Sequence, residues 1–425
     1  MNRSDPLPRA AAAGRPGFRE FIALMAALMA SNALAIDAML PALPAIGEAL
    51  GVAEDNRRQL VITAYLIGFG VAQLGYGPLS DRFGRKGLLV AGLLFYGVFA
   101  TAAGLAGSFT LLLAARAMQG VAAAATRVLV VSIVRDRYSG PAMARVMSLT
   151  MIVFMIVPIL APFFGQAVLA VSTWRHIFIG LGVYGALLAL WTLLRLPETL
   201  APEHKRPLSL GKIGEAVWTT LRTRQSIGNT IAQTLLMGAL FAFIGSIQQI
   251  VFDVFHRPEL LAIVFACIAG PMAISSYANS KLVMRLGSRR ILLIALAAFT
   301  GASAVHLGAA EAFGENIWTF VILQAATMAC FGLIGANAGA LAMEPLGHIA
   351  GTASSLQGVI TTVGGALIGF GIGQQFDGTT IPFLAGFLLC GAASLAVAFW
   401  ANRRPSRDTH DEAEIDIQET ASRPG

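Results

Sequence analysis

Twelve long apolar segments constrain the fold of this chain more than any other feature. A helix needs about 20 mostly apolar residues to cross the hydrocarbon core of a bilayer. Hydrophobic residues make up 56% of the 425 residues and charged residues only 12%, which is too apolar for a soluble domain. We therefore predict an all-α polytopic membrane protein. Its twelve transmembrane helices are expected at 21–46, 59–79, 88–106, 109–134, 145–170, 176–196, 229–251, 260–283, 291–310, 317–341, 350–373 and 380–400.

Most of the 30 lysines and arginines lie in alternate loops. The loops between these basic ones hold only Arg57, Arg58, Arg175 and Arg257. Basic residues collect on the cytoplasmic side of membrane proteins. We therefore expect both termini in the cytoplasm of a bacterial-type inner (plasma) membrane. The net charge of +7 is then a topology signal, and nucleic acid is not an expected partner.

The first apolar segment is expected to stay in the membrane and not to be cleaved as a secretory signal. Arg15 and Arg19 precede it, and the small residues at 31–35 resemble a cleavage site. Its apolar character continues to Ile46, however, which is longer than the apolar region of a signal peptide.

A polar stretch divides the chain into two six-helix halves. It carries mixed charge and three prolines, and residues 208–221 are a candidate for a short amphipathic helix. The acidic C-terminal tail has the composition of a disordered segment. The expected units are an N-terminal cytoplasmic tail at 1–20, a first half at 21–196, a cytoplasmic linker at 197–228, a second half at 229–400 and a disordered cytoplasmic tail at 401–425.

An internal repeat supports the division into halves. Residues 79–86 read LSDRFGRK after the second apolar segment of the first half, and residues 282–289 read LVMRLGSR at the matching place in the second. Met284 stands where the first copy has Asp81. Two parallel six-helix repeats with a substrate site between them are a known transporter architecture.

The ten residues GPLSDRFGRK at 77–86 form the sharpest motif of the chain. They resemble the signature that the major facilitator superfamily carries between its second and third helices, and all defining positions are present. Gly77 and Gly84 permit a tight turn and close helix approach. Arg82 and Arg85 would anchor the loop on the cytoplasmic side.

The resemblance implies a gating role for Asp81. In the superfamily this carboxylate sits near the cytoplasmic start of helix 11, where the positive end of a helix dipole favours an anion. Such a contact would join the two halves while the transporter is open outward. The alternative is a loop that sets topology and has no gating role.

Four more segments extend the resemblance over roughly residues 20–400. Residues 37–44 and 351–358 are similar to bicyclomycin-resistance-type drug:proton antiporters. Residues 116–120 match a superfamily signature in helix 4 that includes Gln119. Residues 158–165, with Pro158, Pro162 and Gly165, resemble the antiporter motif of helix 5, where the prolines favour a bend that suits rocking of the halves. Met39 replaces the aromatic residue usual after the helix 1 aspartate.

Asp37 is the only acidic residue well inside a predicted span. A charge within the membrane is costly, so such a group is a candidate functional residue. Arg116 lies early in the fourth span at a similar depth, and the two are predicted to pair, with Asp37 as the proton carrier. Arg116 would favour the charged form of Asp37 when close and release it when the helices part. A static structural pair is the alternative.

Arg127 lies 11 residues after Arg116, about three helical turns, so both arginines point to nearly one face. Two cations on one face of a cavity would suit an anionic or zwitterionic substrate. Alternatively, Arg127 reaches the inner boundary of the membrane or pairs with a polar neighbour. The candidate substrate contacts are therefore Asp37, Arg116, Gln119 and Arg127.

Motifs for other chemistry are missing from the sequence. It has no phosphate-binding loop for direct use of ATP, no hydrolase or metalloprotease motif and no cluster suited to metal catalysis. We therefore expect no enzyme activity, no cofactor and no metal. The leading hypothesis is a monomeric, proton-coupled exporter of drugs or other small organic molecules in the lipid bilayer. The alternatives are export or import of a specific metabolite, such as an anionic one, or a transporter-like receptor.

Overall fold

The computed structural model describes residues 16–200 and 210–403, which are almost entirely helical. In this part of the chain, eleven helices are long and apolar enough to cross a membrane, and α6 with its apolar stretch Ile156–Val171 completes the predicted twelve. The first half contains α1 (Phe18–Asp37), α3 (Leu60–Phe83), α4 (Arg85–Gly104), α5 (Phe109–Arg137), α6 (Gly140–Val171) and α7 (Trp174–Arg195). The second contains α9 (Arg224–Gln249), α10 (Leu261–Leu286), α11 (Ser288–Phe313), α12 (Ile317–Met343), α13 (Ala350–Val359), α14 (Gly365–Gly373) and α15 (Ile381–Ala401).

Shorter elements complete the chain trace. α13 and α14 form one span through a π-turn, η7 (Ile360–Gly364). α8 (Leu210–Arg222) lies where the sequence predicts an amphipathic linker helix. The rest of the predicted linker at 201–209, and the tails at 1–15 and 404–425, lie outside the described residues. The remaining short helices are η1 (Leu40–Ala42), α2 (Leu43–Ala49), η2 (Asp55–Gln59), η4 (Ile250–Val254), η5 (Pro258–Leu260) and η6 (Glu344–Ile349).

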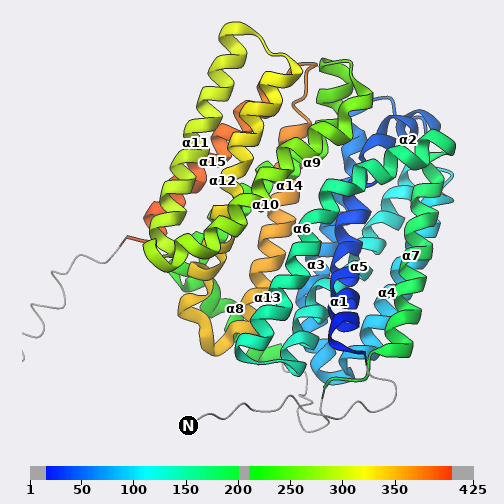
Figure 1. Ribbon diagram of the computed structural model, residues 1–425, viewed down its shortest axis with the longest axis vertical. Coiled ribbons are helices and arrows are strands. Elements are labelled where there is room, and N and C mark those ends of the chain that lie inside the picture. Colours follow the sequence, from blue (N-terminus) through cyan, green and yellow to red (C-terminus); the bar gives the residue numbers. More distant parts are fainter. Residues whose placement is uncertain (1–15, 201–209, 404–425) are drawn as a thin grey trace, which may run out of the picture.

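The two halves lie side by side as helical bundles (Figure 1). We call the end of the bundle where α1 begins and α3 meets α4 the terminal end. The opposite end, with α2, η2 and the turn between α11 and α12, is the distal end. The helices of both halves run between these two ends.

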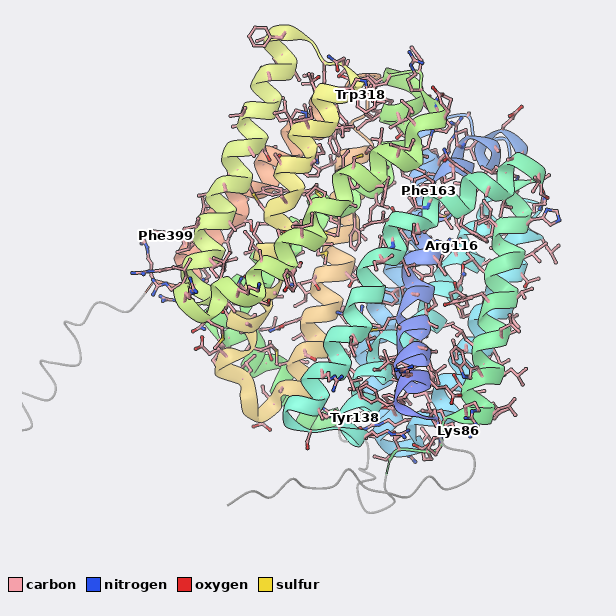
Figure 2. All side chains as sticks on the ribbon, in the orientation of Figure 1. Lys86, Arg116, Tyr138, Phe163, Trp318 and Phe399 are labelled. Atoms are coloured by element: carbon pink, nitrogen blue, oxygen red, sulfur yellow. The ribbon has the colours of Figure 1, made fainter. Side chains whose placement is uncertain are left out.

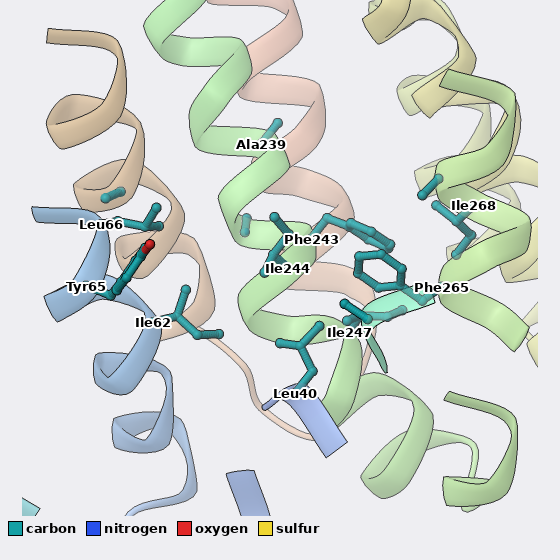
Figure 3. Packing of buried hydrophobic residues seen from close by; sticks show 14 of the residues in the cluster. Leu40, Ile62, Tyr65, Leu66, Ala239, Phe243, Ile244, Ile247, Phe265 and Ile268 are labelled. Atoms are coloured by element: carbon teal, nitrogen blue, oxygen red, sulfur yellow. The ribbon is translucent and has the colours of Figure 1, made fainter. Parts of the chain in front are cut away.

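The buried apolar residues form two clusters that differ in which halves they join. The larger one runs across the interface, where Leu40 and Ile62 of the first half lie close to Ile244 and Ile247 of α9 (Figure 3). The smaller one, which includes Phe21, belongs to the first half alone. Inside a membrane, close van der Waals packing of apolar side chains helps to hold helices together. The two halves are therefore joined through the larger cluster, while the smaller one stabilises only the first half.

Gly165 of α6 marks a point of close approach within the first half. A methyl group at this position would collide with the backbone carbonyl of Ala38, directly after the end of α1. Small residues let membrane helices approach this closely. The contact sets the distance between α6 and the broken end of α1, where the buried acid Asp37 lies.

Gly165→Ala should destabilise the protein because overpacking a close helix contact costs about 1–3 kcal/mol. We expect a lower Tm for the purified variant in detergent. Gly180→Ala in α7 is the matched control, since its added methyl group meets no atom within 4 Å. Equal Tm values for the two variants would contradict the close-packing argument.

Candidate functional site

Arg116, labelled in Figure 2, is completely buried inside the first half, and each nitrogen of its guanidinium donates a hydrogen bond. Its Nε donates to the carbonyl of Val61 (3.1 Å) and its Nη2 to that of Ala35 (2.9 Å), while Nη1 donates to Gln119 Oε1 (2.6 Å). The ring of Tyr65 lies 4.5 Å from the guanidinium carbon, a cation–π distance. Arg116 thus ties α5 to both α1 and α3.

Asp37 ends α1 and is only 3% exposed. Its Oδ1 has no hydrogen-bond partner among the described residues, and none of the ion pairs found there includes Asp37. The predicted pair with Arg116 is therefore not formed in this conformation. The guanidinium bonds the carbonyl of Ala35 instead, two residues before the carboxylate.

A polar chain that the sequence did not reveal joins the Arg116 site to the middle of α5. The hydroxyl of Tyr65 donates to Asn32 Oδ1 (3.0 Å), and Asn32 Nδ2 donates to the hydroxyl of Thr126 (2.9 Å). Thr126 directly precedes Arg127. These side chains come from α3, α1 and α5, so the chain is another fixed contact within the first half.

A cavity of about 700 Å³ lies between the two halves and extends toward the terminal end. The first half lines it with α3 and α5, and the second with η6 and α13. Arg127 faces it with a largely exposed side chain, whereas Asp37, Arg116 and Gln119 do not line it. The two arginines therefore differ in their surroundings: Arg116 is buried in this conformation, and Arg127 is accessible. The polar lining residues that sequence reasoning did not single out are Gln73, Ser132, Arg135, Thr352, Ser354 and Ser355.

The motif loop closes one edge of this cavity. Asp81 and Asp136 both form ion pairs with the nearly buried Arg85, at 2.6 and 3.1 Å. Asp81 also lines the cavity opposite the start of α13. The described residues show no hydrogen bond or ion pair between Asp81 and α13, so the direct contact that the resemblance implies between Asp81 and helix 11 is not found in this conformation. Gly84 has a φ of 100°, in the region that favours glycine, and Arg82 lies over the ring of Phe83.

The other predicted gating residues lie within long helices. Gly77 is in α3 and lines the cavity. Pro158 and Pro162 are both inside α6, which continues as one helix from Gly140 to Val171. Neither proline therefore ends the helix.

The distal end is closed by a set of amide hydrogen bonds between the halves, which we call the distal amide network: Asn56, Gln59, Gln249 and Gln374. Gln59 Nε2 donates to Gln249 Oε1 (2.6 Å), and Gln249 Nε2 donates to Asn56 Oδ1 (2.8 Å). Asn56 Nδ2 donates to the carbonyl of Phe376 (3.0 Å), and Gln374 Nε2 donates to that of Asn56 (2.8 Å). The network links η2 to α9 and to the end of α14.

The cavity and the distal amide network make the arrangement asymmetric. At mid-height Gln73 of α3 donates to the hydroxyl of Thr362 in η7 (3.2 Å). From Gln73 toward the terminal end the cavity lies between the halves, which also pack against each other through α3 and α13, and at the distal end hydrogen bonds join them. This is the geometry of a central site reached from one side only.

Comparisons with known proteins agree with this arrangement. The Major Facilitator Superfamily model matches residues 25–369. An uncharacterised MFS-type transporter of Bacillus subtilis, YdgK, is 31% identical over 84% of this chain and 89% of its own length. A bicyclomycin resistance protein homologue of Haemophilus influenzae is 28% identical over 90% of this chain and 96% of its own length. The crystal structure of a D-xylose-proton symporter superposes with a TM-score of 0.67 at 12% identity, covering 90% of this chain and 97% of the symporter.

The match to the family model extends from the first helix into the second half, and the relatives align along nearly their whole length. The twelve-helix fold, the motif at 77–86 and the cavity between two halves are all accounted for by one family. The chain is a multi-pass membrane transporter and belongs to the Major Facilitator Superfamily.

Proposed function

We propose that this chain is a proton-coupled exporter of drugs or other small organic molecules that works by alternating access. The observation that carries the proposal is the cavity between the halves, which is open toward the terminal end while the distal amide network closes the other. The name of the bicyclomycin resistance homologue supports a drug as the substrate class. One chain contains both halves of the cavity, so we assign a monomer as the working unit.

The terminal end is assigned to the cytoplasm of a bacterial inner membrane. Arg82, Arg85 and Arg135 lie at this end, together with most other basic residues, and such residues favour the cytoplasmic side. The residues at 21–196 and 229–400 would move as two units about the cavity. A substrate would then enter the cavity from the cytoplasm and leave when the distal end opens.

Asp37 is assigned the role of proton carrier. A buried carboxylate without a partner is costly when charged, so this conformation favours the neutral acid. Opening of the distal end would hydrate Asp37 and allow exchange with external protons. The neutral acid would favour return to the distal-closed state, and substrate entry from the cytoplasm would accompany proton release.

Arg127 and Arg135 are assigned to the substrate cavity. Both line it, and no ion pair to either is found among the described residues. Their charges would favour substrates that carry an acidic group, while the serine hydroxyls of α13 offer hydrogen bonds. Arg116 would act through structure, by fixing the position of α1 beside Asp37.

Asp37→Asn should abolish proton coupling because the amide cannot exchange a proton. The measurement is proton release driven by an exported drug in inverted vesicles, after a growth-inhibition panel has identified that drug. We expect at least about a tenfold loss of drug-driven proton flux, with drug binding retained. Unchanged proton release by the Asn variant would show that Asp37 is not the carrier.

Gln249→Leu should weaken the distal closure because it removes two inter-half hydrogen bonds, each worth about 1 kcal/mol. The readout is thiol labelling of Ile62→Cys, a site only 2% exposed in the distal-closed state, with the three natural cysteines replaced. The labelling rate should rise about tenfold as the open population grows.

The matched control for that variant is Gln375→Leu. Gln375 is exposed at the same end, and its side chain makes no hydrogen bond among those found in the described part of the chain. Labelling that rises equally in both variants would mean that the distal amide network does not hold the halves together.

A further inference from the structure

A second large pocket, of about 1220 Å³, lies at the terminal end of the second half, apart from the substrate cavity. It opens between the starts of α9 and α11 and the C-terminal ends of α12 and α15. Four arginines line it: Arg224, Arg289, Arg290 and Arg403. Among the described residues, Glu344 is the only acidic one that lines the pocket, and its Oε2 accepts a hydrogen bond from Gln225 (2.7 Å). The pocket is therefore strongly cationic.

The arginines are not neutralised by the surrounding protein that the structure describes. None of the ion pairs found within the described residues, 16–200 and 210–403, involves any of the four arginines. Arg224 donates only to the backbone carbonyl of Arg403, and Arg289 and Arg290 are exposed toward the pocket. Guanidinium groups match the geometry of phosphate oxygens and can bind them in a bidentate manner.

The internal repeat shows what occupies the same turn in the first half. There the carboxylate of Glu198 accepts hydrogen bonds from the backbone N–H groups of Arg85 (2.9 Å) and Lys86 (3.1 Å), at the start of α4. Although partial burial raises the pKa of Glu198, its hydrogen bonds from backbone N–H groups hold that pKa below its usual value. The first copy of the repeat thus binds an anion that the chain itself supplies.

The second copy has the same turn but no such carboxylate among the described residues. Gly287 has a φ of 76°, as Gly84 has 100°, and α11 begins directly after it. The start of α11 faces the arginine-lined pocket, and its helix dipole adds to the positive potential there. An external anion would therefore occupy, at the start of α11, the place that the Glu198 carboxylate occupies at the start of α4.

The surroundings of the pocket suit a lipid. Phe399 and Trp400, near the end of α15, are 51% and 49% exposed and precede Arg403, with Phe399 at the outer edge of the second half (Figure 2). The guanidinium of Arg403 lies 4.9 Å from the Phe399 ring, and that of Arg224 lies 6.0 Å from the Trp400 ring. Exposed aromatic residues beside basic ones are typical of the membrane–water boundary.

We propose that this pocket binds the phosphate headgroup of an anionic phospholipid. Arg289 and Arg290 hold the phosphate, Arg224 and Arg403 complete the cationic wall, and the acyl chains follow the outer surface beside Phe399. Basic pockets between transmembrane helices on the cytoplasmic side bind such headgroups in other proteins. The site is independent of the substrate cavity and of proton coupling.

The test is lipid binding to the purified full-length chain in detergent, measured by native mass spectrometry and by Tm. Phosphatidylglycerol should bind and raise Tm, and phosphatidylcholine should do neither. Arg289→Gln with Arg290→Gln should weaken phosphatidylglycerol binding by about tenfold or more, because each arginine near an anionic headgroup adds to the electrostatic attraction. Both side chains are exposed, so the variant should retain the Tm of the lipid-free protein.

The control is Arg19→Gln with Arg145→Gln, which removes two exposed arginines from the same end of the other half. Equal loss of lipid binding in the two double variants would overturn the site. If inorganic phosphate raised the Tm as much as phosphatidylglycerol does at equal concentration, the lipid assignment would be overturned. Binding that occurs only after Asp408, Asp411 and Glu412 are neutralised would assign the pocket to the acidic tail instead.

Discussion

The first half depends on one buried cation. Arg116 has no exposed surface, and an unpaired guanidinium inside a membrane protein would be strongly unfavourable. Two backbone carbonyls and one amide oxygen accept hydrogen bonds from the guanidinium, and two aromatic rings lie beside it; these contacts stabilise the buried charge. Because those carbonyls belong to α1 and α3, moving any of the three helices alone would expose the charge. This constraint favours movement of the half as a unit.

In the proposed mechanism, movement of the first half as a unit makes Asp37 sensitive to the position of the other half. Asp37 lies where α1 breaks, beside the part of η1 that packs within the larger apolar cluster. When the distal end is closed, the carboxyl is buried and unpaired, which favours the proton-bound form. When the distal end opens, water can reach it. In the proposed mechanism, closure of the distal amide network and protonation of Asp37 are thereby linked through a shared interface.

The sequence predicted the helices well and the contacts between side chains poorly. The twelve spans follow from local apolar composition, which needs no knowledge of packing. The Asp37–Arg116 pair was inferred from similar depth, but depth does not tell which carbonyls reach the guanidinium first. The distal amide network was missed because Asn56 and Gln249 lie far apart in the chain, and their meeting depends on how the halves pack. Arg127 was singled out from the sequence with its role left open, and its access to the cavity came only from the structure.

The link between Asp37 and distal closure can be measured directly by electron–electron distance spectroscopy. Spin labels at Glu48 and Asp377, both exposed at the distal end in opposite halves, report its opening. Acidic pH should shift the wild-type distribution toward the short distance, and alkaline pH toward longer ones. Asp37→Asn, which mimics the neutral acid, should stay at the short distance throughout. A pH-dependent distribution that is the same in the Asn variant would contradict the account.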